Sequence, residues 1–216
     1  MRHFQAGVLA LAALTALTTG CALNKAEKGA IIGAGAGGAA GAVIGNATGS
    51  TVRGAIIGAV VGGTAGAIIG HQMDKQAEEL AYEIPGATVQ RIGEGIAVTF
   101  PDGVLFGFDS DQLLPAAREN MRKFAASLAK YPDTRTMIVG HTDSQGSDEY
   151  NMDLSTRRAQ SAASFIAGEG VDRARLDTAG RGEAEPIATN GTDAGRQQNR
   201  RVEVAIYASD GARRAQ

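Results

Sequence analysis

The stretch "TRTMIVGHTDSQGSDEYNMDLSTRRAQS", residues 134–161, predicts a strand, a polar loop and a helix in that order. Residues 134–140, "TRTMIVG", are rich in β-branched and apolar residues, which is typical of a strand. A helix follows, indicated by apolar residues at helical spacing: Leu154, Ala162, Phe165 and Ile166. Gly168 and Gly170 end that helix. The loop between the two elements crowds acids around one histidine, and it is therefore the first candidate for a functional site.

Strands and helices alternate on both sides of this stretch. Residues 88–93 and 96–100 flank Glu94 and Gly95 and predict a β-hairpin. Pro115 opens a helix whose apolar stripe consists of Leu114, Ala117, Met121, Phe124, Ala125 and Leu128. Further strands are expected at 104–108, 175–180 and 201–207, the last with Val202, Val204 and Ile206 on one buried face. The predicted class is α+β, in which a β-α-β-α-β-β order after the hairpin builds a mixed sheet with its helices on one face.

The N-terminal part consists of segments with very different compositions. Residues 1–20 have a basic start and a short apolar run, which is typical of an export signal. The run ends in "TTGC", which resembles the lipobox of bacterial lipoproteins, although Thr18 stands where that motif usually has leucine. The resemblance implies lipidation of Cys21 and a short lipidated N-terminus over 21–28. An ordinary signal peptide with a chance cysteine remains the alternative.

A glycine-rich unit occurs twice, at 29–45 and 54–70, with glycine at every fourth position. This period places the glycines along one helix stripe, where they permit close backbone packing. We expect a helical hairpin, and it resembles the glycine-zipper segments of small outer-membrane lipoproteins. Membrane insertion, a periplasmic helix pair and low-complexity disorder all remain open. A helical stalk over 71–86, a globular domain over 87–208 and a flexible tail over 209–216 complete the expected organisation.

Metal binding and catalysis find little support in the polar loop. An EF-hand counted from Asp143 requires glycine at position 6 and glutamate at position 12, where this chain has Asp148 and Leu154. A lone His141 without nearby cysteines is too little for zinc. No nucleophile motif surrounds Ser144 or Ser155. We therefore expect no metal, no cofactor and no enzyme activity, and the net charge of -2 gives no argument for nucleic acid.

Binding of a charged ligand is the remaining interpretation. Asp143 follows a strand, and Arg158 lies one or two turns into the next helix. A carboxylate can hold an ammonium group, and a guanidinium fork can hold a carboxylate, so the two together can accept a zwitterion such as an amino acid head group. The alternative is that Asp143 and Arg158 simply pair with each other.

The motif "TDSQGSDEYNMDLSTRRA", together with "AGRGEAEPIATN" and "NRRVEV", resembles the OmpA-like C-terminal domain over residues 97–207. With the lipobox and the glycine repeat, the whole chain resembles an OmpA-family outer-membrane lipoprotein of the YiaD type. The resemblance implies non-covalent peptidoglycan binding, with Asp143 on the ammonium and Arg158 on the carboxylate of diaminopimelate in the stem peptide. It also implies supporting roles around the ligand for Thr142, Gly146, Asn151, Leu154, Ser155 and Arg200.

The expected function is a non-catalytic tether, held in the outer membrane by lipid and in the periplasm by peptidoglycan. The alternative is a glycine-zipper protein that oligomerises or acts on the membrane and is positioned by its wall-binding domain. The partners implied are peptidoglycan, outer-membrane lipid and a homo-oligomer.

Overall fold

A single mixed sheet organises the computed structural model, which describes residues 50–61, 67–107 and 109–214. The strand order is β1-β2-β5-β3-β4. β3 and β4 pair in parallel and the other neighbours pair antiparallel, so the predicted mixed sheet is confirmed. The strands are β1 (Thr88–Ile92), β2 (Gly95–Pro101), β3 (Thr134–His141), β4 (Leu176–Gly180) and β5 (Arg201–Ala208).

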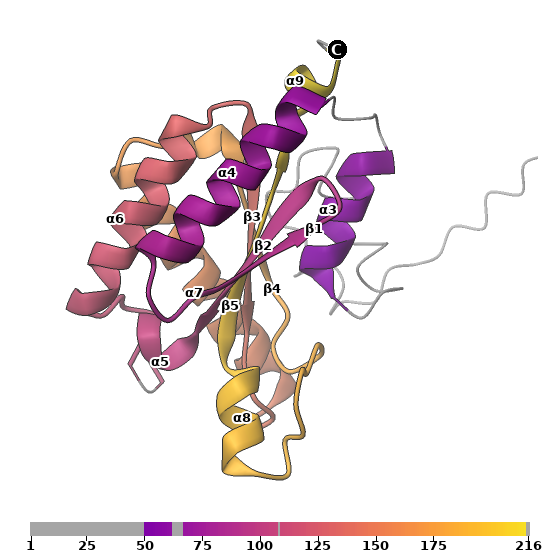
Figure 1. The fold of residues 1–216 in the computed structure, drawn as a ribbon. Helices are drawn as coiled ribbons and strands as arrows, with labels where there is room; N and C mark the ends of the chain where they lie inside the picture. The colour runs from indigo at the N-terminus through magenta and orange to yellow at the C-terminus, as the bar shows by residue number, and fades with distance from the viewer. Residues whose placement is uncertain (1–49, 62–66, 108, 215–216) are drawn as a thin grey trace, which may run out of the picture.

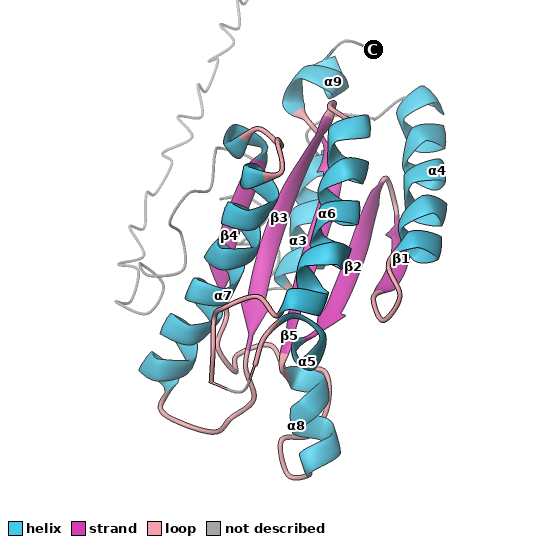
Figure 2. Cartoon of the chain, turned by 90° about the vertical axis from the view of Figure 1, so that its left-hand side faces the viewer, coloured by secondary structure: helices cyan, strands magenta, loops and turns pink. Residues whose placement is uncertain are grey.

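Helices cover both faces of this sheet (Figures 1 and 2). α4 (Ala67–Glu83), α6 (Pro115–Lys130) and α7 (Asp148–Gly168) lie on one face, and α3 (Thr51–Val61) lies on the other. Helices on one face were expected, and α3 adds a layer that the sequence did not predict. The shorter elements are α5 (Asp102–Leu105), η1 (Arg173–Arg175), α8 (Asp193–Asn199) and α9 (Asp210–Arg214).

The two long helices form where the sequence predicts them. α6 begins with Pro115 in its first turn, and its buried face includes Ala117, Met121, Phe124, Ala125 and Leu128, the predicted stripe. The side chain of Ser147 caps α7 by accepting a hydrogen bond from Tyr150 N at 3.2 Å. Asp148 and Glu149 follow in the first turn, where negative charge favours the helix dipole.

Two apolar clusters fill the space on either side of the sheet. Val202, Val204 and Ile206 of β5 face the α6 and α7 side, as predicted. Ala205 and Tyr207 are also buried, because they face α3. The prediction that β5 is half-buried was therefore wrong, since both faces of the strand are covered.

The region 104–108 is not the predicted strand. Asp102–Leu105 form the single turn of α5, and Phe106 makes one isolated bridge to Leu113. The apolar residues Leu105 and Phe106 are buried, which explains their strand-like composition. A short apolar run alone does not distinguish a strand from a buried helical turn.

The structure describes only part of the N-terminal region for which the sequence made predictions. Four predicted features lie outside the described residues: the signal peptide 1–20, the Cys21 lipidation site, the segment 21–28 and the first glycine copy 29–45. α3, which begins just before the second copy and runs into it, packs on the sheet through Val52, Ala55, Ile56 and Ala59. No helix in the described ranges combines the length and the apolar character needed to cross a membrane.

Polar contacts hold the start of α3 against the loop that follows β4. Thr51 N donates to Glu185 Oε2 at 3.0 Å, and Thr51 Oγ1 donates to the other oxygen of the same carboxylate. Arg181 bridges both residues, since its Nε donates to Thr51 Oγ1 and lies 3.3 Å from Glu185 Oε1. A carboxylate at this position satisfies free backbone amides and favours the helix dipole.

The segments expected as a stalk and a tail both pack on the domain. α4 begins within the second glycine copy and buries Met73, Ala77 and Leu80 in the same cluster as the β2 core. Its Gln76 Nε2 donates to Ser127 Oγ of α6 at 3.2 Å. At the C-terminal end, residues 210–214 form α9, and Arg213 donates to the Ala59 carbonyl of α3.

α7 lies unusually close to the strands below it. A Cβ atom added to Gly140 of β3 would lie 2.1 Å from the Ser155 carbonyl oxygen, and one added to Gly180 of β4 would lie 2.2 Å from Thr156 Oγ1. Glycine at these two positions permits backbone contact between helix and sheet. The contact fixes the height of α7 above the ends of β3 and β4.

Docking of α3 on the sheet predicts that alanine substitutions at two adjacent isoleucines lower the stability of the domain by unequal amounts. Ile56 is 1% exposed against the sheet, and Ile57 is 40% exposed. We expect Ile56→Ala to lower the free energy of unfolding by about 2–4 kcal/mol and Ile57→Ala by less than about 1 kcal/mol. Urea denaturation of the full chain measures both. Equal effects would show that α3 does not dock on the sheet.

The close approach of α7 predicts that Gly140→Ala is destabilising by about 1–3 kcal/mol or more, because backbone atoms of α7 must move. Gly168→Ala is the control, since a Cβ atom there meets nothing within 4 Å at the end of the same helix. Thermal unfolding followed by circular dichroism compares the two. A Gly140→Ala variant as stable as the Gly168→Ala variant would contradict the close contact.

Candidate functional site

A cavity of about 470 Å³ opens beside the C-terminal end of β3. Seven of the eight predicted ligand residues line it: Thr142, Asp143, Gly146, Asn151, Leu154, Arg158 and Arg200. The other lining residues are Asp102, Gly103, Phe106, Asp109, Gln145, Tyr150 and Gln197. Residues far apart in the sequence therefore meet at one concave surface that contains charges of both signs.

The end of β3 positions the acidic side of the cavity. Thr142 N donates to the Gly182 carbonyl at 2.8 Å, which holds the chain beside β4 as it leaves the sheet. Asp143 follows, and its Oδ1 accepts a hydrogen bond from Gln145 N at 3.0 Å. Gly146 then turns the chain with a φ of 110°, a conformation that favours glycine. The carboxylate is thereby fixed between the strand and α7.

α7 presents the opposite wall from one helical face. Asn151, Leu154 and Arg158 are spaced three and four residues apart, so their side chains lie along the same side of the helix. All three are buried. Asn151 Nδ2 donates to Glu183 Oε2 at 2.7 Å, which ties the start of α7 to the loop after β4.

The guanidinium of Arg158 is 2% exposed and has several partners. Its Nε donates to the Ser110 carbonyl at 2.9 Å and its Nη2 to the Gly107 carbonyl at 3.5 Å. Nη2 also lies 3.0 Å from Asp102 Oδ2, and the guanidinium carbon lies 5.5 Å from the centroid of the Phe106 ring. These contacts compensate for the burial of the cation and orient it.

Asp143 has a different partner, because Arg200 Nη1 donates to its Oδ2. The side chain of Asp143 is 7% exposed, whereas that of Arg200 is 32% exposed. The direct pairing of Asp143 with Arg158, the alternative left open by the sequence, does not occur: each residue is paired with another group. The cavity therefore contains two separate ion pairs, one on the strand side and one on the helix side.

Asp102 is the most perturbed carboxyl of the cavity. Burial raises its pKa to about 6, against the opposing effect of the Arg158 and Arg200 charges, and the Asp143 charge adds to the increase. Its Oδ1 is buried and has no hydrogen-bond partner among the described residues, and the same holds for Thr142 Oγ1. Buried polar atoms without partners are rare in native proteins, and they can mark places where a ligand or water binds.

Two polar residues of the motif have structural rather than cavity-lining positions. Ser155 is fully buried, donates to the Met152 carbonyl at 2.9 Å and accepts from Gly182 N at the same distance, so it joins α7 to the loop after β4. His141 is buried at the end of β3, and burial with the nearby Arg201 and Arg181 holds its pKa well below the usual range. In the described ranges, no three His, Cys, Asp or Glu side chains are grouped as a metal site.

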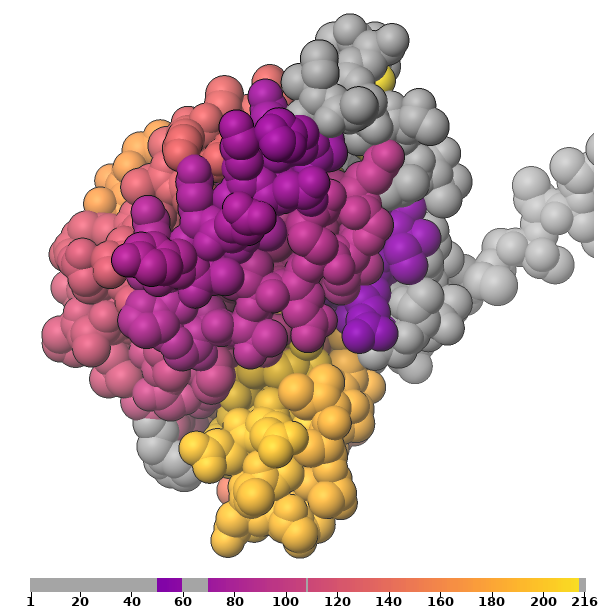
Figure 3. All heavy atoms as spheres, viewed as in Figure 1, coloured from indigo at the N-terminus to yellow at the C-terminus, as the bar shows by residue number. Residues whose placement is uncertain are grey.

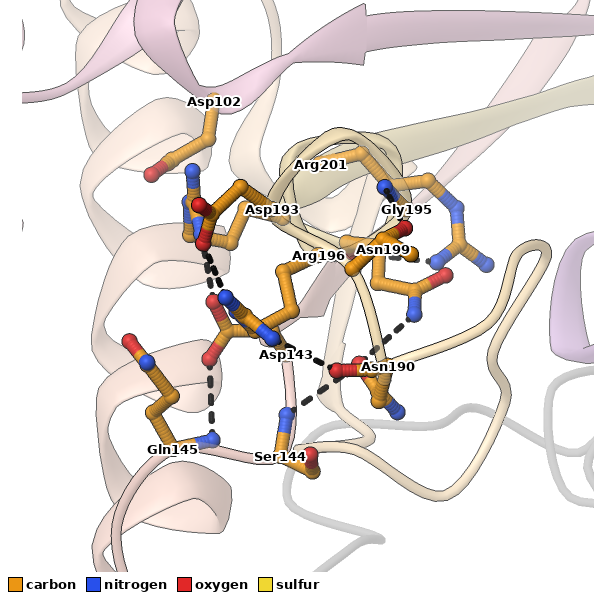
Figure 4. Close-up of polar contacts among 12 residues, drawn as sticks. Asp102, Asp143, Ser144, Gln145, Asn190, Asp193, Gly195, Arg196, Asn199 and Arg201 are labelled. Carbon is orange, nitrogen blue, oxygen red and sulfur yellow. Dashed lines mark hydrogen bonds and ion pairs between the residues drawn. The ribbon is translucent and has the colours of Figure 1, made fainter.

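A lobe around α8 supports the strand side of the cavity (Figure 3). Asn199 is fully buried and makes four hydrogen bonds of 2.8–2.9 Å: its Oδ1 accepts from Ile187 N and Ala188 N, and its Nδ2 donates to the Ala188 carbonyl and to Asn190 Oδ1. Asn190 Oδ1 also accepts from Ser144 N at 3.3 Å, next to Asp143 (Figure 4). The amide network thereby connects the lobe with the binding loop.

Asp102, Phe106, Asp109, Tyr150 and Gln197 were missed by the sequence analysis. One signal was available for Asp102: it lies just after the strand predicted at 96–100, and a buried arginine requires a nearby acid. Because a strand was predicted over 104–108, the sequence did not predict the turn of α5, in which Asp102 contacts Arg158. Tyr150 reaches the same loop, since its hydroxyl donates to Asp109 Oδ1.

Family models match both parts of the chain. The OmpA family matches residues 105–200, and the YMGG-like Gly-zipper matches residues 1–74. Outer-membrane lipoprotein YfiB of Pseudomonas aeruginosa is 37% identical over 115 residues, which cover 53% of this chain and 68% of that protein. The "Probable lipoprotein YiaD" of Escherichia coli (strain K12) is 40% identical over 138 residues and 63% of each chain.

Two further similarities concern proteins with informative names. "Peptidoglycan-binding protein ArfA" of Mycobacterium tuberculosis is 40% identical over 103 residues, which cover 48% of this chain and 32% of that protein. A solved structure described as the cell wall anchor of the T6SS from Pseudomonas aeruginosa has a TM-score of 0.54 and 26% identity, and covers 65% of this chain and 97% of that one. This chain thus spans less than two thirds of YiaD and about a third of ArfA.

The amide network of Asn199 predicts a large loss of stability in Asn199→Ala, because part-buried backbone groups at 187 and 188 lose their partners. We expect the free energy of unfolding to fall by about 2 kcal/mol or more. The control is Gln198→Ala, an exposed neighbour on the same helix, with an effect within about 0.5 kcal/mol. Urea denaturation gives both values. A loss in Asn199→Ala no larger than that of the control would contradict the supporting role of the network.

Proposed function

This chain belongs to the OmpA family, and from that premise we propose that it is a non-catalytic tether between the outer membrane and peptidoglycan. The wall-binding end is the cavity beside β3, and its ligand is diaminopimelate of the stem peptide. One observation carries the proposal: Asp143 and Arg158, of opposite charge, line one cavity without pairing with each other. A zwitterionic head group presents the complementary charges.

Both residues retain capacity for a ligand. A carboxylate has about four acceptor positions, and Asp143 uses one on Gln145 N and one on Arg200. It can therefore accept an ammonium group while it keeps both partners. Nη1 of Arg158 donates no hydrogen bond to the described residues, because the known contacts use Nε and Nη2. That nitrogen is available to a ligand carboxylate.

The remaining lining residues fit supporting roles. Thr142 Oγ1 is a free hydroxyl at the same wall as Asp143. Gly146 gives the loop its turn, Leu154 provides an apolar surface for the methylene chain of the ligand, and Arg200 adds a second cation near Asp143. Ser155 acts from behind by fixing α7 on the loop at Gly182. Equilibrium binding by such a cavity requires no covalent chemistry, so we expect no turnover.

The relatives support the two ends of the tether separately. ArfA is named a peptidoglycan-binding protein, and the structurally similar T6SS protein is described as a cell wall anchor. YiaD and YfiB are named lipoproteins, and YfiB is assigned to the outer membrane. These names favour a location in the cell envelope. We assign the membrane end to a lipid on Cys21, with the OmpA-like domain in the periplasm.

Cosedimentation of the purified full chain with diaminopimelate-containing sacculi tests the wall end. We expect Asp143→Ala and Arg158→Ala each to weaken binding at least about tenfold, because each leaves one ligand charge unpaired. Arg157→Ala is the matched control: it removes the neighbouring arginine of α7, which pairs with Asp111 and Asp153 outside the cavity.

Two further measurements separate binding from folding. Circular dichroism must show native helix content in each variant, and free diaminopimelate must compete with the sacculi for the wild type. Undiminished cosedimentation of Asp143→Ala would place the wall-binding site elsewhere on the chain. Binding that free diaminopimelate does not displace would leave the tether but exclude the assigned ligand.

A further inference from the structure

Asp102 is the first residue of α5 and lines the cavity. The proposed function gives it no role. One oxygen of its carboxyl, Oδ2, holds Arg158 at 3.0 Å. The other, Oδ1, is buried and has no hydrogen-bond partner in the described part of the chain. A carboxyl group with one satisfied and one free oxygen, beside the cation that holds the ligand, is placed to respond to that ligand.

The backbone of Asp102 is firmly held, so the carboxyl cannot simply withdraw. Asp102 N donates to the Arg200 carbonyl at 3.0 Å, and its own carbonyl accepts from Phe106 N at 2.8 Å. The residue is therefore anchored to the strand side of the cavity through Arg200 and to the helix side through Arg158. Its side chain can change protonation more easily than position.

We propose that Asp102 is a ligand-positioning residue that takes up a proton when a ligand carboxylate docks on Arg158. This inference rests on the proposed function of the same cavity. In the empty site, the Asp102 carboxylate neutralises Arg158. When a ligand carboxylate arrives at Nη1, two anions share one guanidinium. A proton on Oδ1 removes the repulsion and converts that oxygen into a donor to the ligand carboxylate.

The charges around Asp102 support this direction. Arg158 on α7 and Arg200 after α8 stabilise its anion, Asp143 after β3 destabilises it, and burial already raises its pKa to about 6. An additional anion in the cavity raises that pKa further. Affinity therefore increases as the pH falls from the pKa of the complex to about 6, and it levels off below that value, because Asp102 is then protonated before the ligand binds.

Isothermal titration calorimetry of the full chain with free diaminopimelate tests the proposal. Titrations at pH 7 in buffers with different ionisation enthalpies give the number of protons taken up. For the wild type we expect a fraction of a proton, roughly 0.3–0.8 per ligand, and an affinity that rises by up to about tenfold per pH unit toward pH 6.

Asp102→Asn keeps an oxygen for Arg158 but cannot titrate. We expect no uptake by the Asp102 position, and an affinity that matches the low-pH plateau of the wild type and changes little between pH 6 and 8. Asp111→Asn is the control, because this acid pairs with Arg157 outside the cavity, and it should retain the wild-type proton uptake and pH profile.

The outcomes separate this inference from the function on which it rests. Wild-type binding without proton uptake at pH 7 overturns the role of Asp102 and leaves the tether intact. The same conclusion follows if Asp102→Asn retains the wild-type uptake. Absence of diaminopimelate binding by a folded wild type excludes the assigned ligand and with it this role of Asp102, and the tether itself is then decided by the cosedimentation with sacculi.

Discussion

The burial of the Arg158 guanidinium is the constraint on which the site depends. A cation at 2% exposure requires hydrogen-bond acceptors and a nearby anion, and the chain supplies them from elements that are distant in sequence. The carbonyls of Gly107 and Ser110 fix the loop after α5, and Asp102 fixes the start of that helix. The cavity wall is thus a consequence of satisfying one arginine, and the proposed ligand would meet arginines that are already paired with Asp102 and Asp143.

The sequence predicted the main sheet and the two long helices because their signals are local. Pro115 and the stripe through Leu128 define α6, and the alternation of Val202, Val204 and Ile206 defines the inner face of β5. Seven of the fourteen residues that line the cavity were also among the predicted ligand residues, but mainly through resemblance, since nothing local indicates that Arg200 meets Asp143. Ser155 shows the limit of this prediction, because it does not line the cavity and instead joins α7 to the loop after β4.

The remaining errors share a physical cause, which is packing between distant segments. α3 carries Gly54 and Gly58 of the four-residue glycine period, so its sequence suggested pairing with the other glycine copy rather than docking on a sheet. The docking depends on Met137, Val139 and Tyr207, which lie much later in the chain. Likewise, residues 102–105 form a buried turn in place of the start of the expected strand, and Asp102 of this turn pairs with Arg158 of α7, a contact that local composition does not indicate.

The position of α3 has a mechanical consequence for a tether. Thr51, near the N-terminal limit of the described residues, is held by its contacts with Glu185 and Arg181. α3 rests on the face of the sheet opposite α7, against Met137 and Tyr207, and the loop that holds Thr51 also contacts α7 through Gly182 and Glu183. In the proposed tether, α3 therefore lies between the N-terminal segment and the cavity, and a load on the chain would bear on the loop at 181–185 that supports both.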